Sequence, residues 1–276
     1  MQYLRNLTWW LTGLTTLIVF VLVVLLSEIL QGQFWDVPRT AIICVYGGIV
    51  LGYLNKFKYL RLGETLVHEI GHAQMVALTL GQVSFIRVER DTSGVTYHRQ
   101  GFIFRRISSA LISLFGPISS AVIFVITARL VASELTAYWA LGLGLFVTLI
   151  LVTTVRNLWG WITGLVLLAI LYLVLEASGY IEPQLLSSSN LVTSNELLVN
   201  VILGITAFNV GSALQYSVQC RVPRNPNSDE HKFSRALFLP LRVGGSLILV
   251  IQLVLVWIGL SYLLGWSSIV EVGRWI

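Results

Sequence analysis

The sequence predicts an all-α membrane protein, a polytopic helical bundle of six or seven spans with one small β-hairpin. Of its 276 residues, 56% are hydrophobic and only 11% are charged, and the mean hydropathy is +0.81. Soluble domains carry roughly 25% charged residues, so this composition excludes an ordinary soluble protein. Apolar runs long enough to cross a bilayer as helices recur along the chain, and each spanning helix needs about 20 such residues.

The charge balance fits a membrane protein without any further partner. The net charge is +5, and multi-spanning proteins keep Lys and Arg in their cytoplasmic loops, so no nucleic acid is expected. Cys44 and Cys220 lie in different segments without C-x-x-C spacing, and they predict neither a disulfide nor a metal-binding pair. The lipid bilayer is therefore the one partner that composition predicts.

We expect one integral membrane domain over residues 1–276. Its parts are N-terminal spans at 1–61, a helix at 62–80, a hairpin at 82–99 and the remaining spans at 107–264. The first apolar run, 9–30, is too long for a signal-peptide core and lacks a cleavage site, which predicts a retained span. The other apolar runs are 40–54, 107–132, 137–155, 158–177, 197–218 and 241–264.

The helix at 62–80, which Gly81 is expected to cap, carries the residues with chemical potential. His68, Glu69 and His72 form the pattern H-E-x-x-H. Residues four apart share one face of a helix, so both imidazoles can address one ion, with Glu69 about 100° round the helix beside it. Zn²⁺ held in this way lowers the pKa of a bound water to about 7, and a carboxylate can then take the proton. The pattern predicts a metal hydrolase site with Zn²⁺ as cofactor and Glu69 as the catalytic base.

A catalytic zinc site normally has three protein ligands, so a third must come from elsewhere in the chain. The only aspartates are Asp36, Asp91 and Asp229. We favour Asp229, because Asn227, Ser228 and Asp229 read as a helix N-terminus just before the last span, although Asp229 could simply cap that helix. Asn157 is the second choice, followed by His98 and His231.

Residues 82–99 differ in kind from the rest of the chain. Short β-rich runs lie on either side of a turn at Ser93 and Gly94, which predicts a hairpin. An open sheet edge cannot face lipid, so the hairpin should lie at the interface or line a cavity. Two roles remain open. Its edge could pair with an extended substrate, with Val83, Phe85, Val95 and Tyr97 as contacts, or it could be a structural plug.

These motifs together resemble the site-2-protease class of intramembrane zinc metallopeptidases, and its compact B-like branch in particular. The resemblance extends from about residue 63 to 264 and rests on the motifs at 68–73, 93–96, 116–117 and 155–160. It implies cleavage of membrane proteins in or near their transmembrane segments, with His68 and His72 as zinc ligands and Glu69 as general base. It also favours Asp229, because B-like members often carry Ser-Asp at this point.

Two positions depart from the pattern of the class. Thr163 stands where the wider class places an aspartate ligand, and a Gly-Pro-x-x-Asn element ends here in Ser120. These departures keep open an alternative, a catalytically inactive pseudoprotease that acts as a membrane binding or scaffold protein. A transporter would require repeats or paired broken helices, and the sequence shows no internal repeat.

The distribution of Lys and Arg predicts the orientation in the membrane. It places 82–106 and 219–235 in the cytoplasm and 178–194 outside. Lys56, Lys58 and Arg61 would violate the rule if 62–80 crossed fully, and a tilted or re-entrant helix removes that conflict. We expect a multi-pass protein of a plasma or inner membrane, with an active site near the cytoplasmic face and a membrane protein as substrate. The oligomeric state stays open.

Overall fold

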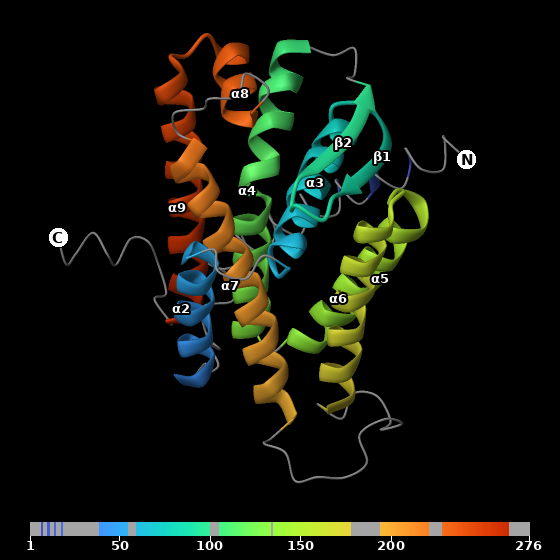
Figure 1. Cartoon of the computed structure of the whole chain (residues 1–276). Coiled ribbons are helices and arrows are strands. Elements are labelled where there is room, and N and C mark those ends of the chain that lie inside the picture. Colours follow the sequence, from blue (N-terminus) through green and yellow to red (C-terminus); the bar gives the residue numbers. More distant parts are fainter. Residues whose placement is uncertain are drawn as a thin grey trace, which may run out of the picture.

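The computed structural model describes residues 39–54, 59–99, 105–133, 135–177, 194–220 and 228–264, and the single residues Leu7, Trp10, Leu11, Leu14 and Ile18. These residues form a mostly helical structure with one two-stranded antiparallel hairpin, as predicted (Figure 1). The elements are α2 (Arg39–Leu54), α3 (Arg61–Leu78), β1 (Gln82–Val88), β2 (Gly94–Arg99), α4 (Arg105–Ala132), α5 (Thr136–Thr153), α6 (Leu158–Ala177), α7 (Ser194–Cys220), α8 (Asp229–Leu237) and α9 (Leu241–Leu263).

Five of the described helices are long and apolar enough to cross a membrane. They are α4, α5, α6, α7 and α9, and α2 is a shorter apolar helix. The predicted span at 9–30 lies outside the described residues apart from a few single positions, and the predicted loop at 178–194 lies outside them up to Ser194. The count is consistent with six or seven spans. The helix that carries the H-E-x-x-H pattern, α3, is not among the five candidate spans.

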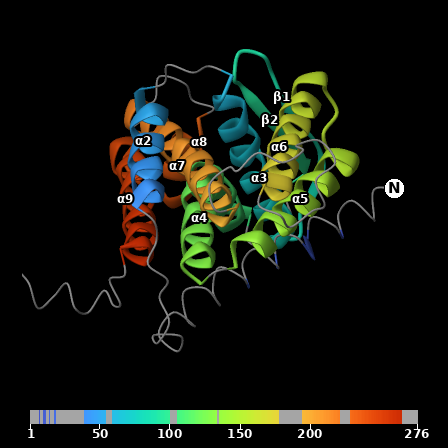
Figure 2. The same ribbon diagram turned by 90° about the horizontal axis from the view of Figure 1, so that it is seen from below.

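Helix α4 occupies the centre of the bundle and is the most buried of the five candidate spans. Viewed along the bundle, α2, α7 and α9 lie on one side of it, while α5, α6 and the hairpin lie on the other (Figure 2). One buried apolar cluster joins α4 to α2, α7, α8 and α9, and a second joins α3 and β1 to α4, α5 and α6. Both halves of the bundle therefore pack on α4.

The close approach of α2 and α7 depends on glycine. A Cβ added at Gly52 would lie 2.2 Å from the Phe208 carbonyl oxygen, and one at Gly211 would lie 2.1 Å from the Ile49 carbonyl oxygen. Small residues let helix backbones approach closely, which is a common source of packing energy between helices in membranes. Gly52 of the second apolar run therefore serves this contact.

The hairpin is tied to the rest of the molecule along one edge. The outer edge of β1 pairs with the turn between α5 and α6, where the Ile86 N–H donates to the Thr154 carbonyl at 3.2 Å and the Arg156 N–H donates to the Ile86 carbonyl at 3.3 Å. Within the described part of the chain, no strand pairs with the outer edge of β2. The sheet therefore offers one unpaired edge.

The end of α3 differs in detail from the prediction. Leu80, with φ 60°, takes the left-handed position that Gly81 was expected to take. Gly81 instead donates its N–H to the Val76 carbonyl at 2.7 Å. An added Cβ there would lie 2.7 Å from Val76 Cγ1 and 2.8 Å from the Arg99 carbonyl oxygen. Glycine is needed at this point because β2 and α3 meet there, and the cap itself is formed by a leucine.

Candidate metal centre

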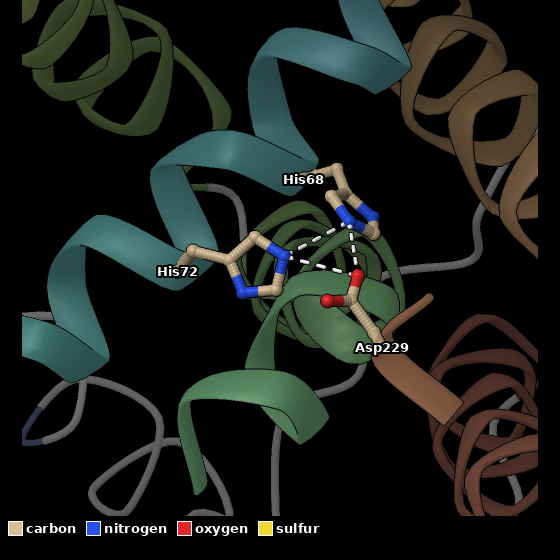
Figure 3. Close-up of side chains that lie close together, drawn as sticks. All are labelled: His68, His72 and Asp229. Carbon is tan, nitrogen blue, oxygen red and sulfur yellow. Dashed lines mark hydrogen bonds and ion pairs between the residues drawn. The ribbon is translucent and has the colours of Figure 1, made fainter. Parts of the chain in front are cut away.

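Three side chains converge on one point from two distant parts of the chain. His68 and His72 leave the same face of α3, and Asp229 meets them from the start of α8 (Figure 3). The Asp229 Oδ2 atom lies 3.0 Å from His68 Nε2 and 3.1 Å from His72 Nε2, and the two Nε2 atoms lie 3.1 Å apart. Sequence reasoning chose these three residues as ligands, and the structure brings them together.

The dimensions of this cluster suit a small divalent cation. Ligand atoms at about 2.0–2.1 Å from a tetrahedral zinc lie about 3.3 Å from one another, close to the three separations found here. Two imidazoles and one carboxylate are a ligand set that catalytic zinc sites use, and it leaves a fourth position open. Among the described residues, this is the one group of three metal-ligating side chains whose ligand atoms lie within 4.8 Å of one another. The residues present therefore fit zinc.

His72 is held in the tautomer and position that a metal ligand requires. Its Nδ1 atom lies 2.7 Å from the Ile112 carbonyl oxygen, so Nδ1 carries the hydrogen and Nε2 presents its lone pair to the cluster. Gly116 on α4 lies against the ring, because a Cβ there would come within 2.4 Å of His72 Nε2. The glycine of the Gly116–Pro117 pair thus makes room for the His72 ring.

Glu69 is buried beside the ligands and is oriented by the hairpin. The Thr96 hydroxyl lies 2.6 Å from Glu69 Oε2 and 2.9 Å from the Glu69 carbonyl oxygen. Gly94 also packs on this side chain, since an added Cβ would lie 2.7 Å from Glu69 Oε1. The hairpin therefore fixes the carboxylate predicted to be the base.

Asp229 occupies the first position of α8, as the Asn227-Ser228-Asp229 pattern predicted. Ser228 caps the helix by accepting a hydrogen bond from the His231 N–H at 3.3 Å. The positive end of a helix dipole favours a carboxylate at this place. Lys232 Nζ lies 3.9 Å from Asp229 Oδ1. Ser228 rather than Asp229 therefore caps the helix, and the Asp229 carboxylate joins the cluster.

Asp229 and the two imidazoles shift one another's protonation. Burial acts to raise the pKa of Asp229, but the charges and hydrogen bonds of His72 and His68 hold that pKa well below its usual range. Burial likewise acts to lower the pKa of His68, but the hydrogen bond and charge of Asp229 raise it to about 9. Without a cation, the cluster therefore holds a proton at neutral pH.

The cluster opens into a cavity of about 840 Å³. The cavity runs between α3 and β2, and residues from α4, α7 and α8 complete its wall. Tyr216 of α7 lines it near His68, with the two ring centroids 6.3 Å apart. The site thus combines a ligand cluster, an adjacent carboxylate and space for a substrate.

The other residues considered for the third ligand position do not join the cluster. The Asn157 side chain pairs with the backbone of Val88, accepting its N–H at 3.2 Å, so it secures β1. Thr163 donates to the Trp159 carbonyl at 2.8 Å within α6. His98 lines the same cavity, but its Nδ1 atom lies 3.0 Å from the Thr96 carbonyl oxygen, and His231 Nε2 lies 3.1 Å from Arg235 on the surface of α8. None of the four contributes an atom to the cluster.

The four hairpin residues expected to contact a substrate have different surroundings. Val95 lines the cavity and is 46% exposed, and Tyr97 is 44% exposed and stacks on Phe85 with ring centroids 4.2 Å apart. Val83 departs from the expectation, because its side chain is 0% exposed in the apolar cluster beneath the sheet. A side chain buried there cannot reach a substrate.

Several residues of the site were not singled out from the sequence as part of it. Gly94 and Thr96 were noted only as part of the hairpin and of the motif at 93–96, and Gly116 only as part of the motif at 116–117. Tyr216 gave no signal, because an aromatic residue in an apolar run is usual in a membrane span. The function of each depends on a neighbour distant in the sequence.

Comparison with known families gives one match. A family model described as Peptidase M50B-like matches residues 40–259. No curated protein and no solved structure matches the chain significantly. The matched range begins in α2, ends in α9 and contains all three residues of the cluster.

Proposed function

The chain belongs to the peptidase M50B-like family, and from that membership and the metal centre we propose that it is a zinc-dependent intramembrane endopeptidase. In this proposal it hydrolyses peptide bonds in or near the transmembrane segments of other membrane proteins. One observation carries the proposal: His68, His72 and Asp229 converge in a cavity where the Glu69 carboxylate lies beside them.

The chemistry divides between the cation and the protein. Zinc held by the two imidazoles and Asp229 would polarise the scissile carbonyl group and acidify the attacking water. Glu69 takes a proton from that water as the bond to the carbonyl carbon forms, and then delivers it to the leaving amine. The Thr96 hydroxyl holds the carboxylate in place for both transfers, because it donates to the oxygen Oε2 at 2.6 Å.

The unpaired edge of β2 is the proposed docking edge for the substrate. Val155 already pairs beside Ile86 on β1, so an extended peptide can join the sheet only along β2. Backbone hydrogen bonds to an exposed strand recognise peptides with little dependence on sequence. Val95 lies on this strand and lines the cavity, so a peptide docked here would pass close to Glu69.

The proposed location follows from the arrangement of the charged segments. α8, the hairpin and the start of α4 lie at the same end of the bundle (Figure 1). Arg105 and Arg106 begin α4, and Lys232 and Arg235 lie on α8. Basic segments are retained in the cytoplasm, so we assign this end to the cytoplasmic face. Water then reaches the cavity without crossing the hydrocarbon layer.

The test compares two substitutions in the purified protein. Glu69→Gln should retain zinc and lose cleavage by about 100-fold or more, because only the proton acceptor is removed. Asp229→Ala should lose both zinc and cleavage, because two imidazoles alone hold the ion poorly. Zinc is measured by elemental analysis, and cleavage with a panel of tagged single-span proteins in liposomes.

Glu89→Gln is the matched control. Glu89 lies in the hairpin turn, outside the cluster, and its carboxylate forms an ion pair with Arg87 at 2.8 Å. It should leave both readouts unchanged. Cleavage by Glu69→Gln at the unmodified rate would remove Glu69 from the mechanism. Zinc binding without cleavage of any substrate in the panel would favour the alternative, an inactive binding or scaffold protein.

A further inference from the structure

The cavity extends past the ligand cluster to a recess at the start of α3. Arg61, Glu64 and Thr65 of α3 face Asp91, Thr92 and Ser93 of the hairpin turn across this recess. We call these six residues the Glu64 recess. The Thr65 hydroxyl lies 2.9 Å from the Thr92 carbonyl oxygen, so the turn is fastened to the helix at this point. This hydrogen bond therefore fixes the two sides of the recess relative to each other.

Glu64 lies one helical turn before His68, on the same face of α3. Only 6% of Glu64 is exposed, and the side chain lines the cavity. Among the described residues, none forms a hydrogen bond or an ion pair with its carboxylate, and the nearest cationic groups that act on it are His68 and Arg61. Burial raises the pKa of Glu64 and makes its charged form costly, so a cation brought into the recess would stabilise the carboxylate. The role proposed above for the site does not use this side chain.

The other charged groups of the recess do not satisfy Glu64. Arg61 lies on the same turn of α3, but it makes no ion pair with Glu64 within 4.0 Å, and its Nε atom has no hydrogen-bond partner in the described part of the protein. The Asp91 carboxylate accepts hydrogen bonds from the Ser93 N–H at 3.0 Å and the Ser93 hydroxyl at 2.6 Å. Across the cavity, Lys232 lies beside Asp229. The charges of His68 and Arg61 act on Glu64 without forming an ion pair with it, and its carboxylate lines the cavity.

We propose that the Glu64 recess receives a lysine or arginine side chain of the substrate and makes Glu64 a specificity-determining residue. This inference rests on the proposed function. Glu64 lies about 6 Å along α3 from His68, and an extended peptide advances about 3.4 Å per residue. The basic residue therefore lies about two residues from the scissile bond. The carboxylate gains a cation in direct contact, which no described residue of the protein supplies.

The experiment measures binding, so that it does not depend on cleavage. The binding protein is the zinc-loaded Glu69→Gln variant in detergent. The probes are fluorescent decapeptides of Ala, Val and Ser that carry Lys, Gln or Glu at each position in turn. The Lys peptide should bind about 10- to 100-fold more tightly than the Gln peptide at one position, as expected for a hydrogen bond between charged groups.

Adding Glu64→Gln should abolish that preference and leave the affinity for the Gln peptide unchanged within about twofold. Adding Glu64→Lys should reverse the preference in favour of the Glu peptide, and adding Glu64→Asp should retain it. Because Glu64→Asp preserves the charge, it keeps the inference testable if Glu64→Gln folds poorly. Glu89→Gln is the matched control and should bind all peptides as before.

Three results would overturn the inference. One is a Lys preference that survives Glu64→Gln. Another is an equal loss of affinity for all three peptides together with a loss of zinc, which would mean that Glu64 supports the metal centre. The third is a second metal equivalent that disappears in Glu64→Gln, which would mean that the recess holds an ion. Failure of cleavage in the wild-type protein would contradict the proposed function and leave this readout intact.

Discussion

At the scale of single residues, the site depends on groups that position its ligands. The imidazole of His72 is held between its Ile112 hydrogen bond and the backbone of α4 at Gly116. Groups that orient a ligand typically change metal affinity by about 10- to 100-fold when they are altered. The second layer of the site is thus built from backbone atoms as much as from side chains.

Gly116→Ala should lower zinc affinity by about 10- to 100-fold, because the new Cβ would displace the His72 ring. Zinc competition with a chelator measures this change. Gly144→Ala is the matched control, since its nearest contact would be Leu168 Cδ2 at 3.9 Å. Equal affinities in the two variants would show that the ring is not held by α4.

Zinc affinity should also rise with pH. The pKa of His68 is raised to about 9 in the ion-free protein, so below pH 9 an incoming cation must displace a proton. Apparent affinity should therefore increase by up to about tenfold per pH unit between pH 7 and 9, and then level off. Chelator competition across this range measures the slope. In Asp229→Asn, which lacks the charge that raises the pKa, the rise should end at lower pH.

The residues of the proposed metal site differ in how far the sequence could predict their roles. His68, Glu69 and His72 lie within two turns of one helix, so their spacing alone predicts a shared ion. Asp229 is 157 residues from His72, and its choice over Asn157 rested on a capping pattern and a resemblance. Both residues stand beside a helix start. Only tertiary packing separates their roles, because it directs one to the cluster and the other to Val88.

At the scale of elements, the hairpin shows where a periodic pattern misleads. Alternation along a strand places residues two apart on one face, which grouped Val83 with Phe85. An irregularity between these two residues shifts the register, so Val83 and Ile86 both point into the core. Bulges of this kind have no clear sequence signature here. The existence of the hairpin was predictable from the sequence. The direction in which the first side chains of β1 point was not.

The α2–α7 contact gives a prediction at the same scale. Gly52→Ala should destabilise the protein by about 1–3 kcal/mol, because the added methyl group would meet the Phe208 backbone. Gly47→Ala in the same helix is the matched control, since a Cβ there has no atom within 4 Å. Unfolding in detergent mixtures compares the two variants. If both variants unfold alike, the close contact does not contribute to stability.

At the scale of the whole molecule, composition was the strongest guide. Apolar runs long enough to cross a membrane predicted the class of fold, because only helices and closed barrels satisfy the hydrogen bonds of the backbone in lipid. The described residues contain five such helices. The orientation in the membrane and the extent of the single domain remain predictions from the sequence. Both follow from charge distribution and chain length, and neither is tested by the contacts between the described residues.

Orientation can be tested by labelling single cysteines in a chain whose Cys44 and Cys220 are replaced by serine. Ser188→Cys should react with an impermeant maleimide from the outside of intact cells, because it lies in the segment 178–194, which is predicted to be an outside loop and has no Lys or Arg. Arg87→Cys, on the exposed side of β1, should react only after permeabilisation. The opposite pattern would invert the proposed topology.

The wide separation of the ligands has a mechanical consequence. Two of the proposed ligands come from an early helix and one from a late helix, so an ion bound between them would join parts of the chain that 157 residues separate. A cross-link of this kind lowers the conformational entropy of the unfolded chain, and this effect grows with the length of the closed loop. An ion that serves catalysis in this bundle would therefore also stabilise its fold.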